Sequence, residues 1–186
     1  MPRLFSAVEI PPDIAAQLAF FRGGLQGARW IEPTDYHATL RFFGDVDARV
    51  AQALAADLAE TESFSGGAPL RLALDEIGAF GGRSPRALYA RVKSEPLLVR
   101  LQGAHETIAR RNGLAPETRK FAPHVTLARL RGVSASAVGA WLAQRAFPLA
   151  LAFEPKRFVL YSSRASVGGG PYRVEAVYPF CGDGGD

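Results

Sequence analysis

The chain contains one cysteine, Cys181, and only three lysines among its 22 basic residues. A single cysteine excludes an internal disulfide framework and a zinc site built from several cysteines. No apolar run approaches the roughly 18 residues that a membrane-spanning helix needs. The first ten residues alternate in polarity, which is not typical of the apolar block of a signal peptide. We therefore expect a cytoplasmic protein without a membrane partner.

Charge and size place few limits on function. The net charge of +4 permits a polyanionic partner. However, 19 of the 22 basic residues are arginines in an alanine-rich chain, and a biased genome composition would produce the same pattern. The 186 residues, of which 48% are hydrophobic, suit one soluble domain or two closely packed lobes.

Hydrophobic periodicity predicts an α+β protein. Alternating residues predict strands over 3–10, 35–43, 70–74, 88–92, 121–130, 149–153, 157–163 and 172–180. Capping and apolar-stripe signals predict helices that begin near Pro12, Asp47, Glu95 and Ser134. Because strands and helices do not alternate strictly, we expect mostly antiparallel sheets. The prediction is one domain over residues 1–181, with a hairpin turn at 168–170 and a disordered tail at 182–186.

Two of the three histidines lie in the same local sequence, H-x-T-L. The two copies are His37-Ala38-Thr39-Leu40 and His124-Val125-Thr126-Leu127, nearly half the chain apart. With only six threonines in the chain, chance repetition is a poor explanation. The third histidine, His105, lies in a predicted helix beside an apolar stripe and has no such motif. We therefore expect His105 to be structural and the other two to form a site.

The first motif lies in a predicted strand, where residues two apart point to the same face. His37 and Thr39 therefore share a face, and the same alternation adds Arg41 to it. Leu40 and Phe42 are expected to point into the core. This pattern predicts His37 as a catalytic residue, with Thr39 and Arg41 as candidate phosphate ligands.

The second motif repeats the arrangement. His124 and Thr126 share a face, and the small side chain of Ala122 on that face leaves room for a substrate. Simple alternation places Arg129 on the opposite face, so a phosphate-binding role for it requires a bulge or the end of the strand. We predict His124 as the second catalytic residue, Thr126 as a phosphate ligand and Arg129 as a further candidate.

Paired histidines suit general acid–base chemistry at phosphorus. An imidazole with an ordinary pKa of about 6.5 can be neutral or protonated near neutral pH, so one ring can accept a proton while the other donates one. In-line displacement needs these groups on opposite sides of the phosphate. Threonine hydroxyls can donate hydrogen bonds to its non-bridging oxygens. This chemistry needs no metal ion, and we expect no cofactor.

Several segments, quoted as they stand here, resemble a known family. They are RLFSAV at 3–8, Trp30 ahead of YHATLRFFG at 36–44, FAPHVTLAR at 121–129, LYSSR at 160–164, GPY at 170–172 and YPF at 178–180. Together they are similar to the 2H phosphoesterases, named for two H-x-T/S-x motifs. The resemblance is closer to the bacterial RNA 2′,3′-cyclic phosphodiesterases, also called LigT or ThpR proteins and formerly 2′-5′ RNA ligases.

The resemblance implies a two-lobed fold with a pseudo-two-fold axis and a central cleft, with one motif in each lobe. It implies hydrolysis of the terminal 2′,3′-cyclic phosphate of RNA to a 2′-phosphomonoester. It also implies that His37 is the proton donor and His124 the acceptor, while Thr39 and Thr126 bind the phosphate. The motifs are chemically alike, so the residues themselves allow either assignment of the two roles.

Other functions remain open at this stage. The same site could form 2′-5′ linkages or hydrolyse a small cyclic nucleotide. A protein that binds nucleotides or RNA without turnover would carry the same residues. We expect a monomer whose partner is RNA with a 2′,3′-cyclic phosphate end or a small cyclic nucleotide.

Overall fold

The computed structural model describes residues 3–145, 148–163 and 172–180. Its strands are β1 (Arg3–Glu9), β2 (Ala28–Trp30), β3 (His37–Asp45), β4 (Leu72–Phe80), β5 (Ala87–Val92), β6 (His124–Leu130), β7 (Leu151–Phe153), β8 (Arg157–Ser163) and β9 (Tyr172–Pro179). Its helices are α1 (Pro12–Ala19), α2 (Ala48–Leu58), α3 (Pro96–Arg111) and α4 (Ala135–Ala143), with short 3-10 turns η1 (Pro33–Asp35) and η2 (Ala59–Thr61). The predicted α+β class is confirmed. The predicted turn at 168–170 and tail at 182–186 lie outside the described residues.

The helices begin where local chemistry favours a start. The Asp47 side chain accepts a hydrogen bond from a backbone N–H of the first turn of α2 at 2.8 Å, and Ser134 does the same for α4 at 3.1 Å. Helices α1 and α3 begin with Pro12 and Pro96, at a position where the missing N–H of proline is not needed.

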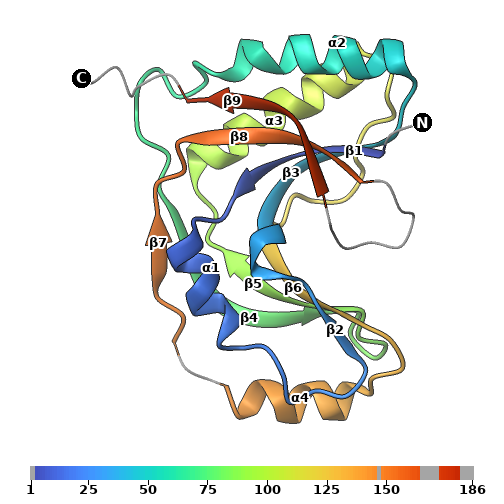
Figure 1. The fold of residues 1–186 in the computed structure, drawn as a ribbon, viewed down its shortest axis with the longest axis vertical. Helices are drawn as coiled ribbons and strands as arrows, with labels where there is room; N and C mark the ends of the chain where they lie inside the picture. Colours follow the sequence, from blue (N-terminus) through green and yellow to red (C-terminus); the bar gives the residue numbers. More distant parts are fainter. Residues whose placement is uncertain (1–2, 146–147, 164–171, 181–186) are drawn as a thin grey trace.

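The strands form one curled sheet in the order β7-β4-β5-β6-β3-β1-β8-β9, with β2 paired to β6. All its described ladders are antiparallel. One lobe contains β3, β1, β8 and β9, and the other contains β6, β5, β4, β7 and β2. A single residue pair joins β3 to β6 at the centre (Figure 1). The main strand order therefore divides into two four-strand halves that meet edge to edge at the motif strands β3 and β6, and β2 adds a fifth strand to the second half.

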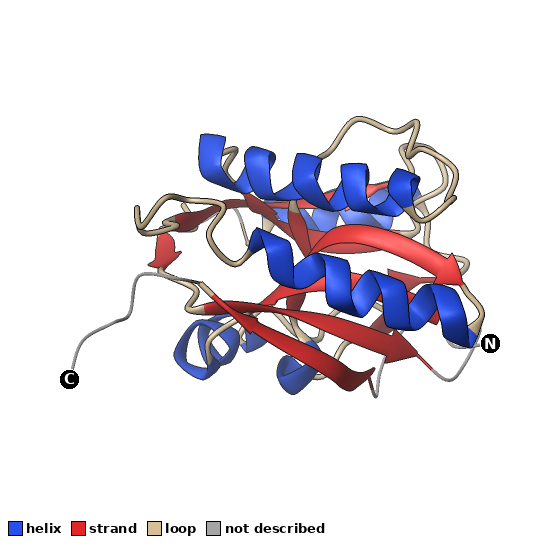
Figure 2. Cartoon of the chain, turned by 90° about the horizontal axis from the view of Figure 1, so that it is seen from above, coloured by secondary structure: helices blue, strands red, loops and turns tan. Residues whose placement is uncertain are grey.

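Helices cover the outer side of each lobe. Helices α2 and α3 contact each other, and α3 packs on β3; Figure 2 shows two long helices side by side over the strands. Helices α1 and α4 contact the other lobe, at β7 and β4. The chain crosses between the lobes several times, so neither lobe is a continuous half of the sequence. None of the described helices has both the length and the apolar character needed to cross a bilayer.

His105 lies in the core, as expected for a structural histidine. Its ring is fully buried on α3, with Nδ1 2.8 Å from Ser6 Oγ and Nε2 3.2 Å from Thr61 Oγ1. The Thr61 hydroxyl donates to a backbone carbonyl, so its oxygen accepts from Nε2–H and the Ser6 hydroxyl donates to Nδ1. Burial lowers the pKa of His105 to about 3, which keeps the ring neutral.

Candidate active site

The two H-x-T motifs lie on neighbouring antiparallel strands. Ala38 on β3 pairs with Val125 on β6, and both are buried. These are the middle residues of the motifs, so their flanking residues point to the opposite, more open face. The structure thus brings His37 and His124 to one face of the sheet, where β3 and β6 meet (Figure 1).

Both catalytic candidates make the same hydrogen bond. His37 Nδ1 lies 2.7 Å from the backbone oxygen of Asp35, and His124 Nδ1 lies 2.7 Å from that of Ala122. A carbonyl oxygen only accepts, so each Nδ1 carries the hydrogen and donates it. Neither Nε2 bonds to any other described residue. Each ring is therefore oriented by the residue two positions before it, and its Nε2 is not engaged by the part of the chain that the structure describes.

Aromatic rings surround each histidine. Phe5 and Tyr172 lie 5.0 Å and 5.1 Å from the His37 ring, centroid to centroid. Phe80 contacts His124 edge-on at 4.7 Å and stacks on Tyr89 at 4.1 Å. The two environments differ in detail but both exclude water from one side of the imidazole.

Burial lowers the pKa of both histidines. Desolvation is the main cause at His37, and the nearby positive charges of His124 and Arg129 add to it, so the pKa of His37 falls to about 4. Desolvation also lowers the pKa of His124, again with a contribution from Arg129. The backbone hydrogen bond at each Nδ1 opposes these shifts without reversing them. Both rings therefore favour the neutral form at neutral pH.

A bulge follows the threonine in the first motif and changes which side chains face the site. In the ladder with β1, Leu40 is an extra residue between the paired positions Thr39 and Arg41. The predicted position of Arg41 beside His37 is therefore wrong, because the bulge turns its side chain inward, where it is 7% exposed. The predicted core position of Phe42 is wrong for the same reason, and this ring is 44% exposed.

The second motif has a bulge at the equivalent place. In the ladder with β5, Leu127 is the extra residue between Thr126 and Ala128. Ala128 becomes fully buried, and Arg129 is exposed on the same side as the histidines. A phosphate-binding role for Arg129 required a bulge that reverses the alternation of side chains, and β6 has such a bulge. Its guanidinium forms no salt bridge with a described carboxylate and is close enough to lower the pKa of both histidines.

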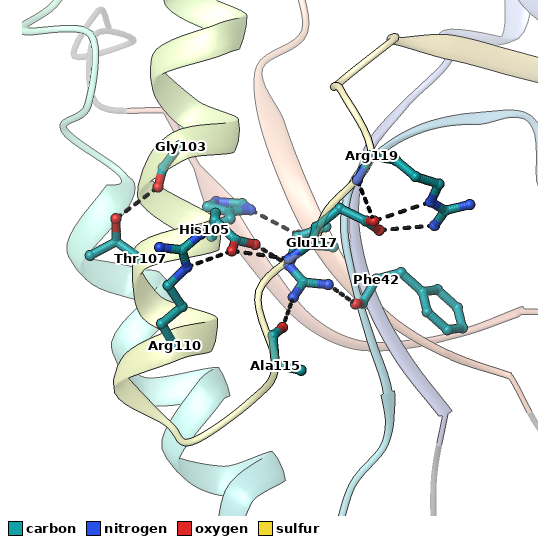
Figure 3. Close-up of polar contacts among 11 residues, drawn as sticks. Phe42, Gly103, His105, Thr107, Arg110, Ala115, Glu117 and Arg119 are labelled. Atoms are coloured by element: carbon teal, nitrogen blue, oxygen red, sulfur yellow. Dashed lines mark hydrogen bonds and ion pairs between the residues drawn. The ribbon is translucent and has the colours of Figure 1, made fainter.

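Arg41 instead joins the first motif to the loop that leads into the second. Its guanidinium pairs with Glu106 of α3 at 2.5 Å and donates to the backbone oxygens of Phe42 and Ala115. Figure 3 shows both carbonyls facing this one guanidinium. Further along the same loop, Glu117 accepts from Arg119. Arg41 is therefore a structural residue that holds the loop before β6.

Thr39 and Thr126 remain on the histidine face and are half-buried. Neither side-chain hydroxyl bonds to another described residue, so both are free to donate to an oxygen anion. Together with Arg129 they form a polar surface beside the two Nε2 atoms. The described part of the chain contains no group of three or more histidine, cysteine, aspartate or glutamate residues placed to hold a metal ion.

The sequence did not reveal the aromatic wall beside His124. Tyr89 lies across Gly78 of β4, where an added Cβ would be 2.6 Å from the Tyr89 hydroxyl oxygen. A glycine inside a strand often marks a place where another group approaches closely. Gly78 therefore indicates a close approach at this point of β4, but the sequence does not identify Tyr89 as the residue that approaches.

Comparisons with known proteins agree with this geometry. Residues 8–89 and 92–172 match the family described as LigT like Phosphoesterase. The RNA 2′,3′-cyclic phosphodiesterase of Bacillus subtilis (strain 168) is 31% identical over 170 residues, which are 89% of this chain and 86% of that protein. Its counterpart in Escherichia coli (strain K12) is 29% identical over 133 residues, 68% of this chain and 71% of that protein. The crystal structure of E. coli LigT complexed with 3′-AMP matches with a TM-score of 0.78 and 26% identity, over 97% of this chain and 99% of that one.

A two-lobed antiparallel fold with one histidine–threonine pair on each central strand defines a 2H phosphoesterase. The chain belongs to the LigT like phosphoesterase family. The predicted LigT-like fold and the predicted enzyme class are both confirmed.

Proposed function

We propose that the chain hydrolyses the terminal 2′,3′-cyclic phosphate of RNA to a 2′-phosphomonoester without a metal ion, using His37 and His124 as proton donor and acceptor. The observation that carries this proposal is the matched orientation of the two imidazoles. Both Nδ1 atoms are held by backbone oxygens at 2.7 Å, and both Nε2 atoms are left for chemistry on one face. Relatives named RNA 2′,3′-cyclic phosphodiesterase support the choice of substrate.

The reaction balances with the two histidines alone. Neutral His124 takes a proton from water through Nε2, and the water oxygen forms a bond to phosphorus. The bond from phosphorus to O3′ breaks on the opposite side, and protonated His37 gives its proton to O3′. The product carries the phosphate on O2′ and a free 3′-hydroxyl. Exchange of protons with solvent then restores the starting states of both rings.

Burial disfavours the protonated form of His37, and the bound phosphate must favour it again for the ring to act as a proton donor. Its pKa of about 4 leaves the free ring neutral near pH 7. A bound phosphate anion next to the ring favours the imidazolium form, so the pKa of His37 rises when substrate binds. His37 is therefore protonated, and able to donate a proton, mainly when the phosphate of the substrate is bound beside it.

Thr39, Thr126 and Arg129 are proposed to bind the non-bridging oxygens. The two hydroxyls donate neutral hydrogen bonds from the two strands, and the guanidinium supplies a positive charge. These groups stabilise the negative charge on the phosphate oxygens during displacement. Arg129 thereby takes the role that a metal ion has in other phosphoryl-transfer enzymes.

Incubation of a short RNA ending in a 2′,3′-cyclic phosphate, with and without EDTA, tests the proposal. We expect conversion to one product at the same rate in both samples, and loss of conversion in the His37→Ala and His124→Ala variants. Inhibition by EDTA that added metal reverses would contradict metal independence. Binding of the RNA without turnover at high protein concentration would instead favour a non-catalytic binding protein.

Two same-site activities remain as outcomes of this test. A second RNA with a free 5′-hydroxyl would yield a 2′-5′ linkage if the site catalyses ligation. A small cyclic nucleotide turned over faster than the RNA end would identify that class as the substrate. E. coli LigT forms a complex with 3′-AMP, which supports a nucleotide ligand in either case.

A further inference from the structure

A cavity of about 420 Å³ opens beside His124 in the second lobe. Its walls come from the β4–β5 pair and from the segment that leads into β6, and they include Phe80, Tyr89, Lys93, Lys120, Phe121 and His124. Phe80 and Tyr89 are also the rings that pack against His124. The cavity therefore continues directly from the phosphate site and shares a wall with it.

The cavity is positively charged. Its lining includes three cations and one carboxylate, and that carboxylate, Asp75, is bound by Arg91 through two contacts at 2.8 Å and 3.1 Å. Lys93 and Lys120 are both exposed, and neither ammonium forms a salt bridge with a described carboxylate. Two of the chain's three lysines thus lie in one cavity next to His124, and the one carboxylate of the lining, Asp75, is bound directly by Arg91 rather than by either lysine.

The cavity also presents aromatic rings. Phe121 is half-buried in its lining, and the stacked pair of Phe80 and Tyr89 forms another part of the wall. Rings of this kind stack with nucleobases of any sequence, and unpaired lysines beside them bind backbone phosphates. A volume of this size lies within the usual range for a small-ligand site and suits about one nucleotide.

The segment that leads to Lys120 is held in place by contacts that lie outside the cavity. Glu117 accepts hydrogen bonds from the backbone N–H and the guanidinium of Arg119, and its backbone N–H in turn donates to Glu106 of α3 at 3.2 Å. Figure 3 shows Arg119 folded back on Glu117. Lys120 follows directly, so its backbone is anchored before a ligand binds, which lowers the entropic cost of binding.

We propose that this cavity binds the RNA chain next to the terminal cyclic phosphate, with backbone phosphates on Lys93 and Lys120 and a base against the aromatic wall. The inference rests on the proposed function and narrows its substrate class. A small cyclic nucleotide occupies only the phosphate site between the histidines. A single-stranded RNA end occupies both places, so the chain prefers RNA ends over mononucleotides.

The test compares two substrates. One is a tetrauridylate that ends in a 2′,3′-cyclic phosphate, and the other is uridine 2′,3′-cyclic phosphate. We expect kcat/KM to be higher for the tetranucleotide in the unmodified protein. In the Lys93→Gln/Lys120→Gln double variant, the ratio of the two kcat/KM values should fall by about tenfold. The slope of log(kcat/KM) against log(salt) for the tetranucleotide should become shallower by about 1.4, because each lost phosphate contact on a single strand removes about 0.7.

The matched control is the Arg49→Gln/Arg100→Gln double variant. It removes the same charge from two exposed positions on α2 and α3, which belong to the other lobe. We expect this variant to keep the substrate ratio and the salt slope of the unmodified protein. Equal changes in the two double variants would show that net charge alone attracts RNA, and would overturn the proposed cavity site.

Two further outcomes separate this inference from the proposed function. Equal kcat/KM values for both substrates, unchanged in the lysine double variant, would overturn the cavity site and leave the hydrolysis intact. Failure of the unmodified protein to hydrolyse either substrate would overturn the proposed function. In that case fluorescence anisotropy with a labelled tetrauridylate ending in a 2′-phosphate still tests the cavity, because the lysine variant must bind it more weakly than the arginine control does.

Discussion

Ala38 and Val125 face each other across β3 and β6, at the centre of the two H-x-T motifs. An antiparallel pair has a local two-fold axis, so this single pairing places each histidine diagonally across from its counterpart. The bulges at Leu40 and Leu127 follow at the same distance after each histidine. The two halves of the site are therefore built by the same local backbone geometry, and they differ mainly in the side chains beyond the bulges.

Asparagine and glutamine replacements at the histidines test which ring nitrogen reacts. His37→Asn keeps a donor near the position of Nδ1, where it can still reach the Asp35 oxygen, but it removes Nε2. We expect His37→Asn and His124→Asn each to lower kcat by about 10²–10⁴-fold, the usual contribution of one general acid or base. Their circular dichroism and melting temperatures should stay close to those of the unmodified protein.

The matching variants His37→Gln and His124→Gln place an amide near the position of Nε2. They should be equally inactive, because an amide does not exchange a proton near neutral pH. Substantial activity in any of these four variants would show that the corresponding histidine transfers no proton.

The pH dependence should differ between the free and the substrate-bound enzyme. Burial and nearby cations hold both histidine pKa values below the ordinary value of about 6.5, with His37 at about 4. The proposed reaction needs one ring protonated and the other neutral, so we expect kcat/KM to fall as pH drops through the lower pKa and as pH rises through the higher one. Both limbs of the kcat/KM profile should therefore lie below about pH 6.5.

In the complex, the phosphate anion favours both imidazolium forms, so the limbs of the kcat profile should move to higher pH. Steady-state kinetics from pH 4 to 9 measure both profiles. A kcat/KM profile with both limbs above pH 7, or two profiles that coincide, would contradict this account of the site.

Arg129 and Arg41 should respond differently to the same substitution. Arg129→Gln removes an unpaired, exposed cation beside the histidines. We expect it to lower kcat/KM by about 10–100-fold, as for the loss of one hydrogen bond to a charged group, with little change in the free energy of unfolding. Equal activity of Arg129→Gln and the unmodified protein would exclude Arg129 from phosphate binding.

Arg41→Gln removes one of the two arginines that pair with Glu106, at a pair whose side chains are 7% and 15% exposed, while Arg110 stays paired with Glu106 at 2.7 Å. We expect it to lower the free energy of unfolding by about 2–3 kcal/mol, since it removes a largely buried ion pair and the hydrogen bonds to the backbone oxygens of Phe42 and Ala115. Urea unfolding measures this loss. Arg110→Gln is the matched control: it removes the other, exposed arginine that pairs with Glu106 and should lower the free energy of unfolding by only about 0.3–0.5 kcal/mol.

Much of the site could be predicted from the sequence, because the repeated H-x-T-L pattern is local. The faces of Arg41, Phe42 and Arg129 could not be predicted, since a bulge adds one residue to a strand and reverses the alternation after it. Nothing in the residue types at Leu40 and Leu127 marks them as the extra residues. The contact between motifs nearly half the chain apart depends on long-range strand pairing, which periodicity does not encode.

Gly78→Ala should disturb the site without touching a catalytic residue. The added methyl group would meet the Tyr89 ring and displace it, and Tyr89 packs near His124. We expect kcat/KM to fall by about tenfold while the protein stays folded, since small displacements of positioned groups reduce catalysis strongly. Gly103→Ala on α3 is the control, because its Cβ would have no atom within 4 Å. It should leave activity unchanged and raise the melting temperature slightly. Equal activity of the two variants would show that Tyr89 does not position His124.

Phosphorus NMR of the product tests the central claim most directly. The unmodified protein is incubated with an oligonucleotide that ends in a 2′,3′-cyclic phosphate, in parallel with the His37→Asn and His124→Asn variants. The account predicts that the cyclic phosphate signal is replaced by that of one 2′-phosphomonoester in the unmodified protein alone. Persistence of the cyclic signal with the unmodified protein, or the same monoester from either variant at the same rate, would contradict it.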